Sequence, residues 1–257
     1  DRYLLGWLAG PDVLAVYGWA ARIGGILNVL LVQSLQLAFL AIGLKTLYGA
    51  DGRLRDSTLH PRVFRHFAAL GGFASLGLSL ITYDGTRLLS SEPAYLGASG
   101  LVLPIALGYV GYGLYFVVVN VLYAAGETRR ISQGVVGAAV GNGVLNLALI
   151  PVLGAMGAAL ATVLAFAGLA LYAERVARRH AAIQYPWGAA LASGAVAALL
   201  AIAAGPSEAW GLGARVALRA GLLAAYPVAL IALGLYQLRE IREGAAQARA
   251  WFRGLRG

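Results

Sequence analysis

Long apolar segments alternate with short polar connections along the whole chain. Seven of these segments have about the length at which an α-helix crosses a hydrocarbon core of roughly 30 Å. We expect the helices at residues 13–44, 68–89, 101–125, 131–151, 155–173, 187–204 and 214–238. The pattern therefore predicts an all-α protein, built as a polytopic bundle of transmembrane helices.

The connections between these segments differ in charge. Lys and Arg gather in 45–67, in 126–130, in 175–180 and in 239–257, whereas the turn at 151–154 carries neither. Positive residues are retained on the cytoplasmic side of a membrane. We therefore expect these four regions to be cytoplasmic, the 151–154 turn to lie outside and the C-terminus to end as a basic cytoplasmic tail.

Composition supports a membrane protein and argues against several other classes. The chain is 60% hydrophobic and 12% charged, whereas soluble domains carry about 25% charged residues. The net charge of +9 comes mostly from arginines in the connections, where topology and anionic headgroups explain it. We expect no nucleic-acid partner. The sequence has no Cys, its three His lack metal-ligand spacing, and no catalytic motif is present, so we expect no metal, no cofactor and no enzyme activity.

Five arginines lie outside the basic connections: Arg2, Arg22, Arg87, Arg215 and Arg219. An ionisable group at membrane depth costs at least about 2.5–3.5 kcal/mol, so it usually faces a partner or a watery cavity. Arg22 is the deepest of them. Its position in the first half of a span leaves two alternatives, which are a functional site and a side chain that snorkels to the interface.

Two other groups of charges have simpler interpretations. Asp84 and Arg87 are three residues apart, a spacing that predicts an ion pair on one helix face. Arg215 and Arg219 lie one helical turn apart where the last span begins. We expect these two to contact lipid headgroups.

Small and amide residues mark the fourth span. Gly137 and Gly141 form a GxxxG motif, which favours close helix packing and is also compatible with helices that slide during transport. Asn142 and Asn146 share one helix face. They predict a hydrogen bond between helices or, as the alternative, one wall of a polar cavity.

Several segments resemble the second lobe of polysaccharide flippases of the multidrug/oligosaccharidyl-lipid/polysaccharide exporter superfamily. They read DRYLLG at 1–6, VYGWAARI at 16–23, AAGET at 124–128, NGVLNLALIP at 142–151 and GAMGAALAT at 154–162. Members of this family often have a proline near positions 38–42, and this chain has none there.

The resemblance implies a MATE-like transporter with two lobes. Residues 1–180 would form the C-terminal six-helix lobe, with its first helix mostly missing, and 181–238 would add two transmembrane helices. Residues 239–257 would be the cytoplasmic tail. The chain begins at Asp1 without a Met, so we expect an N-terminal lobe of the same protein as a partner.

The resemblance also implies a function in polysaccharide and lipopolysaccharide biosynthesis. The protein would be a flippase that moves an undecaprenyl-diphosphate-linked oligosaccharide from the inner to the outer leaflet of the bacterial inner membrane, by alternating access. Because arginine meets phosphate with several donors, Arg2 and Arg22 are the expected phosphate ligands, followed by Arg87. Asn120 and Asn142 are the expected polar contacts of this substrate, aided by tyrosines at 17, 109 and 112.

Three other functions remain open. A multidrug or cation extruder of the same superfamily would need an acidic site, for which the spans offer only Asp1 and Asp84. A membrane enzyme of cell-envelope synthesis is the second alternative. A non-transporting scaffold is the third.

Overall fold

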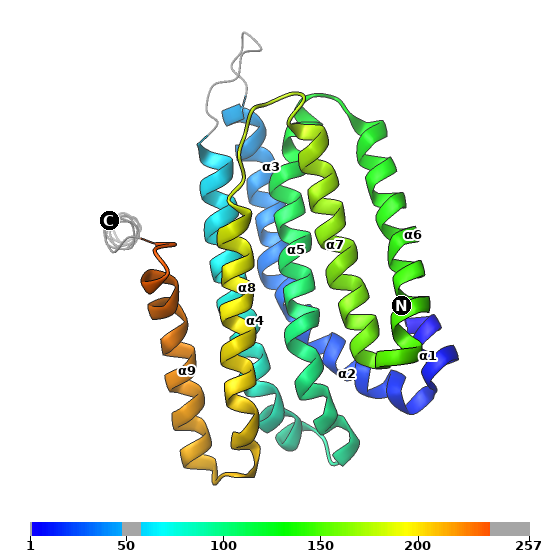
Figure 1. The fold of residues 1–257 in the computed structure, drawn as a ribbon, viewed down its shortest axis with the longest axis vertical. Coiled ribbons are helices and arrows are strands. Elements are labelled where there is room, and N and C mark those ends of the chain that lie inside the picture. Colours follow the sequence, from blue (N-terminus) through cyan, green and yellow to red (C-terminus); the bar gives the residue numbers. More distant parts are fainter. Residues whose placement is uncertain (1, 48–57, 237–257) are drawn as a thin grey trace, which may run out of the picture.

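The computed structural model describes residues 2–47 and 58–236, and these residues form a bundle of helices (Figure 1). The helices are α1 (Arg2–Ala9), α2 (Pro11–Leu27), the π-helix η1 (Asn28–Val32), α3 (Gln33–Leu47), α4 (Leu59–Leu89), the 3₁₀-helix η2 (Pro93–Ala98), α5 (Ser99–Ala124), α6 (Thr128–Leu153), α7 (Ala155–Ala177), α8 (Trp187–Ala204), the 3₁₀-helix η3 (Gly205–Ala209) and α9 (Leu212–Ala232). The prediction of an all-α fold is confirmed.

Seven helical segments are long and apolar enough to cross a membrane, and they coincide with the seven expected spans. The largest difference is at α4, which already begins at Leu59. The end of the polar connection expected at 45–67 is therefore the first part of this helix. The basic tail expected at 239–257 lies outside the described residues.

The described arginines separate between the two ends of the bundle. One end holds the first turns of α4 and α6 and the last turn of α7, with the link to α8; we call it the basic end. Its arginines are Arg62, Arg65, Arg129, Arg130, Arg175, Arg178 and Arg179. The opposite end holds η2, the α6–α7 turn, the α8–α9 turn and α1. The other described arginines, namely Arg2, Arg22, Arg87, Arg215 and Arg219, lie toward it.

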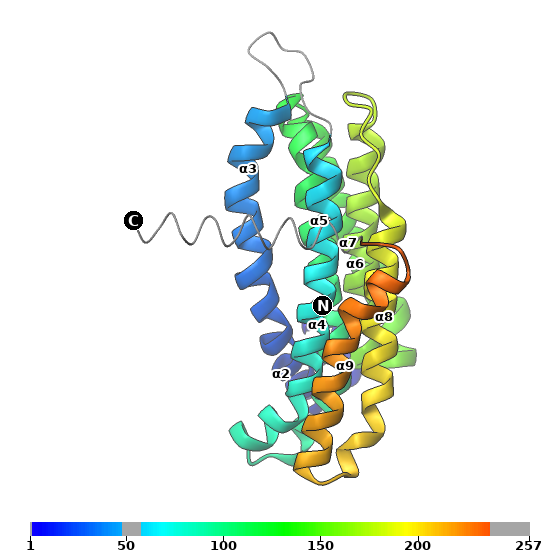
Figure 2. The same ribbon diagram turned by 90° about the vertical axis from the view of Figure 1, so that its left-hand side faces the viewer.

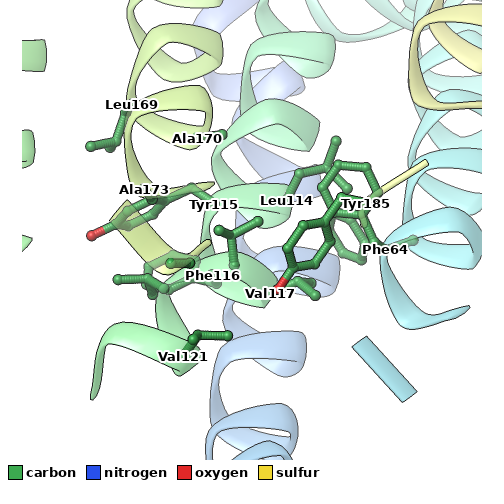
Figure 3. Close-up of a cluster of buried hydrophobic side chains, with 14 of the residues drawn as sticks. Phe64, Leu114, Tyr115, Phe116, Val117, Val121, Leu169, Ala170, Ala173 and Tyr185 are labelled. Atoms are coloured by element: carbon green, nitrogen blue, oxygen red, sulfur yellow. The ribbon is translucent and has the colours of Figure 1, made fainter. Parts of the chain in front are cut away.

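Helix α5 is the centre of the fold. It is apolar around its whole circumference and buried along most of its length, as expected of a helix surrounded by others. Figure 3 shows side chains of α4, α7 and the 181–186 link meeting those of α5, among them Phe64, Tyr115, Leu169 and Tyr185. This packing holds α2, α3, α4 and α7 against α5.

The first span changes direction without a proline. Figure 1 shows α2 lying obliquely across the lower part of the bundle, whereas α3 runs along it. Between them the chain forms a π-helix at Asn28–Val32. Short π segments widen the helix locally and are a recognised cause of kinks. The change of direction therefore lies at Asn28–Val32, before positions 38–42, where the chain has no proline.

The turn predicted at 151–154 is present and tight. Gly154 ends α6 and begins α7 with φ 55°, a conformation that glycine adopts at little cost. Close packing follows at Gly157, where an added Cβ would lie within 2.6 Å of the Leu149 backbone. At Gly137 and Gly141 an added Cβ would meet nothing within 4 Å. The GxxxG motif is therefore not a close helix contact in the described part of the chain.

Helices α8 and α9 pack beside α4, on the side of the bundle away from α6 (Figures 1 and 2). Tyr226 of α9 is buried, and its hydroxyl donates to the carbonyl oxygens of Ala69 (3.1 Å) and Ser193 (3.3 Å). These contacts join α9 to α4 and α8. The last two helices are therefore attached mainly through α4.

Candidate functional site

Two of the predicted phosphate ligands line the same cavity. This cavity, about 610 Å³ in volume, lies where α1, α2 and η2 meet. We call it the arginine cavity, and its lining residues are Arg2, Tyr3, Gly6, Leu14, Ala15, Gly18, Trp19, Arg22 and Tyr95. Arg2 and Arg22 are both exposed and come from different helices. The fold therefore brings two cations, 20 residues apart in sequence, to the wall of one cavity.

Aromatic side chains form another part of this wall. Trp19 and Tyr95 stack with their ring centroids 5.3 Å apart and an interplanar angle of 9°. The indole Nε1 of Trp19 donates to Thr86 Oγ1 at 3.0 Å, which fixes the ring against the end of α4. Stacked and anchored rings beside guanidinium groups are suited to a ligand that carries both sugar and phosphate.

A larger, apolar groove begins next to the arginine cavity. It has a volume of about 980 Å³ and lies between α2 with η1, α4 and α9. We call it the α4 groove. On α4 its lining extends from Leu70 to Leu89, which corresponds to about 28 Å along the helix. The groove therefore runs through nearly the thickness of a hydrocarbon core, about 30 Å.

The polar residues of the α4 groove gather at one end. Thr82, Asp84 and Thr86 line it near the end of α4, together with Arg22 and Arg219 from the neighbouring helices. Further along α4, toward Leu70, the wall is apolar. The α4 groove therefore carries its arginines at one end, which lies away from the basic end of the bundle. The rest of the groove is lined by apolar side chains.

Arg22 and Trp19 line both the arginine cavity and the α4 groove. Within the described part of the chain, Arg22 forms no ion pair. Its charge is therefore available at the place where a polar cavity joins an apolar groove. Of the two alternatives for Arg22, this position favours a functional site over simple snorkelling.

The charges of Asp84 are arranged differently from the sequence prediction. Asp84 pairs with Arg215 at 2.5 Å and with Arg219 at 2.5 Å, both from α9. The predicted pair with Arg87 is wrong: Arg87 is exposed and forms no ion pair with any described residue. Asp84 binds α9 because two guanidinium groups on successive turns of that helix face it.

Arg215 and Arg219 are also not the headgroup contacts at the surface that we expected. They are only 4% and 9% exposed. Arg215 donates through Nε and Nη2 to Asp84 and through Nη1 to the Trp210 carbonyl at 3.2 Å. Both guanidinium carbons lie within 6 Å of the Tyr83 ring centroid, which is a cation–π distance.

The remaining predicted ligands are elsewhere. Arg87 lines neither the arginine cavity nor the α4 groove. Asn120 is buried in the α5 core, where its Nδ2 donates to the Phe116 carbonyl at 3.1 Å. Asn142 is half-buried on α6. The tyrosines at 109 and 112 pack against Phe166 of α7. Tyr17 is a buried residue of α2 and precedes Gly18, which lines the arginine cavity.

The amides of the fourth span interact within their own helix. Asn146 Nδ2 donates to the carbonyl oxygen and to Oδ1 of Asn142, at 2.8 and 2.9 Å. These bonds form within α6 because the two residues are four apart, the spacing of adjacent turns. Asn142 and Asn146 are thus bonded to each other within α6, whereas the sequence predicted a bond between helices.

Sequence reasoning missed a buried carboxylate at the basic end. Glu174 of α7 accepts hydrogen bonds from Nη2 of Arg178 at 2.9 Å and from Nε1 of Trp187 at 2.6 Å. The Trp187 bond ties the end of α7 to the start of α8. Nearby, burial raises the pKa of Tyr185 and the Glu174 carboxylate raises it further. A glutamate four residues before an arginine was the only signal in the sequence.

Comparison with models of known protein families gives no match, and comparison with curated proteins gives no match either. Among the described residues, no group of three His, Cys, Asp or Glu side chains could hold a metal ion. The chemistry of the site is that of a cationic and aromatic cavity, the arginine cavity, joined to the apolar α4 groove.

Proposed function

We propose that this protein is a flippase for a lipid-linked oligosaccharide, and that it forms the second lobe of a two-lobe transporter. The observation that carries the proposal is the position of Arg22, on the shared wall of the arginine cavity and the α4 groove. A diphosphate-linked lipid has the same two parts, because its anionic, sugar-bearing head is joined to a long apolar chain. The head would occupy the cavity, and the chain would lie in the groove.

Each part of the site has a physical role in this proposal. Arg2 and Arg22 supply guanidinium groups, which bind phosphate oxygens with two parallel hydrogen bonds. The Trp19–Tyr95 stack supplies an aromatic face for a sugar ring. The wall of the groove from α4 and α9 supplies apolar surface over much of the thickness of the hydrocarbon core. The multi-pass helical fold provides the setting that such a substrate needs.

The charge at this site favours an anionic lipid over a cationic drug. A cation extruder needs a carboxylate that is free to bind its substrate. Asp84 lines the α4 groove, but Arg215 and Arg219 already neutralise it. Arg22 and Arg219 line this end of the groove beside that paired carboxylate, an arrangement that favours phosphate over a cation.

Sidedness follows from the positive-inside rule. The basic end would face the cytoplasm, and the arginine cavity would open toward the outer leaflet of the bacterial inner membrane. A headgroup bound at Arg22 would then be near the side on which it is released. The sequence resemblance to polysaccharide flippases agrees with this direction of transport.

The test is polymer export by the full-length protein in cells that lack their own flippase. Arg22→Ala should abolish export, because the arginine cavity loses the cation that also lines the α4 groove. The variant should still insert into the membrane. Arg22→Lys should retain part of the activity, since it keeps the charge and loses the paired donors.

Arg87→Ala is the matched control, because this exposed arginine near the same end lines neither the cavity nor the groove. Wild-type export by Arg22→Ala would remove Arg22 from the site. Loss of drug resistance without any change in export would instead favour the extruder.

A further inference from the structure

Helices α6 and α7 touch near both of their ends. Toward the basic end, Gly134 of α6 lies against the Tyr172 ring, which an added Cβ would approach to 2.7 Å. At the other end, Gly157 of α7 packs against the backbone of Leu149. A cavity of about 320 Å³ runs from the first contact toward the second. We call it the α6 groove.

The α6 groove is open on the outside of the bundle. Helix α6 is the least buried of the seven described spans and packs chiefly against α7. Gly137 and Gly141 line the groove, and a Cβ added at either would meet nothing within 4 Å. On α7 the groove is lined by Leu164, which is 51% exposed. The groove therefore faces the surrounding bilayer along its side.

The length of the α6 groove matches one leaflet of a membrane. On α6 its lining extends from Gln133 to Leu145, which corresponds to about 18 Å along the helix. One half of a hydrocarbon core is about 15 Å thick. The α6 groove is therefore long enough for an acyl chain of the leaflet at the basic end, and too short for a chain that crosses the membrane.

Two arginines lie at the basic end of the groove. Arg130 precedes Gln133 and Gly134 by about one turn of α6, and Arg175 follows Tyr172 by three residues on α7. Residues three or four apart share a helix face. The two helices run in opposite directions from their tight turn (Figure 1), so both arginines are at the same end. Both are exposed, and neither forms an ion pair with a described residue.

The described carboxylates near this end already have partners. Glu127 contacts Nε2 of His180 at 3.1 Å, and Glu174 pairs with Arg178 at 2.9 Å. The two arginines beside the groove are thus available to an anion, and guanidinium groups bind phosphate oxygens with charge-assisted hydrogen bonds. The exposed amide of Gln133 lies just inside the groove and adds a further donor.

We propose that the α6 groove binds one anionic phospholipid of the leaflet at the basic end. Its phosphate lies at Arg130 and Arg175, and one of its acyl chains lies along the groove. Charge complementarity selects the headgroup, and the space beside Gly137 and Gly141 receives the chain. The site is on the side of the bundle away from α8 and α9, so it is separate from the α4 groove and does not depend on what the protein transports.

The experiment measures lipid binding to the full-length protein by native mass spectrometry, with phosphatidylglycerol and phosphatidylcholine of the same chains. The wild-type protein should retain one phosphatidylglycerol molecule preferentially. Arg130→Gln combined with Arg175→Gln should reduce this preference roughly 25-fold, because each arginine near a membrane surface contributes a factor of about five. Both side chains are exposed, so the thermal midpoint should stay that of the wild type.

Gly141→Leu tests the groove without changing a charge. The new side chain would occupy the open space beside α7, so the variant should lose the retained lipid of either kind. A Cβ at this position meets nothing within 4 Å, and leucine is a better helix former than glycine, so α6 should still form. Retention of phosphatidylglycerol as in the wild type would contradict a chain in the groove.

Arg62→Gln combined with Arg129→Gln is the matched control for the two arginines. Both residues are exposed arginines of the basic end. Arg62 belongs to α4, and Arg129 lies about 100° around α6 from Arg130, away from the groove. The control should leave the preference unchanged. Inorganic phosphate should not displace the lipid, because it has no chain to fill the groove.

The outcomes decide the proposal in either direction. An unchanged preference in the variant that lacks Arg130 and Arg175 would overturn it. An equal loss in the control, or displacement by inorganic phosphate, would overturn it too, because the effect would then come from charge alone. A lipid-free dimer that Gly141→Leu separates would show that a second copy fills the groove. Transport by Arg22 variants is measured separately, so failure of this site leaves the proposed function untouched.

Discussion

The two ends of the bundle each hold an ion-paired carboxylate, Glu174 at the basic end and Asp84 at the opposite end, but the arginines that pair with them differ. At the basic end, Glu174 pairs with a single arginine, Arg178, whose side chain is 62% exposed. At the opposite end, Asp84 pairs with two arginines that are almost completely buried. The first cluster is neutral and partly open to water. In the second, two buried arginines share one carboxylate.

This difference indicates what each cluster does. A neutral pair with an exposed partner loses little when it is broken and mainly connects α7 to α8, through the bond from Trp187. Two buried guanidinium groups are costly without the carboxylate that they share. We therefore interpret the Glu174 cluster as structural. The Asp84 cluster fastens α9 to α4 at the end of the α4 groove.

The largest expected effect comes from Asp84→Asn. The substitution removes the carboxylate that two buried guanidinium groups share, which should lower the free energy of unfolding by about 3–5 kcal/mol. Reversible unfolding in mixed micelles, followed by tryptophan fluorescence, measures it. Glu92→Gln is the control, because this exposed carboxylate is near the same end. A cost below that of the Glu174 variant described below would contradict the comparison.

The two arginines that face Asp84 should differ from each other. Arg215→Gln removes a doubly bonded partner of Asp84 and a bond to the Trp210 carbonyl, so we expect a loss of about 1.5–3 kcal/mol. Arg219→Gln removes one bond to Asp84 and should cost less. Parallel unfolding curves of the two variants measure the difference. Equal costs would contradict the expected difference between the two arginines.

Glu174→Gln should have the smallest effect of this series, about 1 kcal/mol. The amide oxygen still accepts from Trp187, and the exposed Arg178 is left in water, so no buried charge is stranded. The thermal midpoint of the purified protein measures the change. A loss as large as that of Asp84→Asn would mean that the two ends are alike.

The spans were predictable because each depends on residues that are adjacent in the sequence. An apolar run of membrane length gives a helix wherever it lies, and Gly154 after Pro151 marks the tight turn between α6 and α7. The separation of basic residues between the two ends followed in the same way. The π-helix at Asn28–Val32 was not predictable, because no proline or glycine marks it.

The partners of buried charges depend on contacts that sequence spacing does not contain. Asp84 and Arg215 are 131 residues apart, so the nearer Arg87 was chosen in error. Arg2 and Arg22 stood out because they lie outside the basic connections, and they line one cavity. Asn120 was selected for its polarity, yet it bonds to the backbone of its own helix. Trp19 and Tyr95 were missed as a pair, because only the fold brings η2 against α2.

The central claim is that Arg22 binds the headgroup of a transported diphosphate lipid. The most direct measurement uses the full-length protein in vesicles that contain undecaprenyl-diphosphate linked to a fluorescent oligosaccharide. A reagent that cannot cross the membrane then reports how fast the labelled head changes leaflet. The account predicts that the wild-type protein moves the lipid and that Arg22→Gln slows it at least about tenfold, as expected when a charged hydrogen bond is lost. Equal rates in the two proteins, or no movement by the wild type, would contradict it.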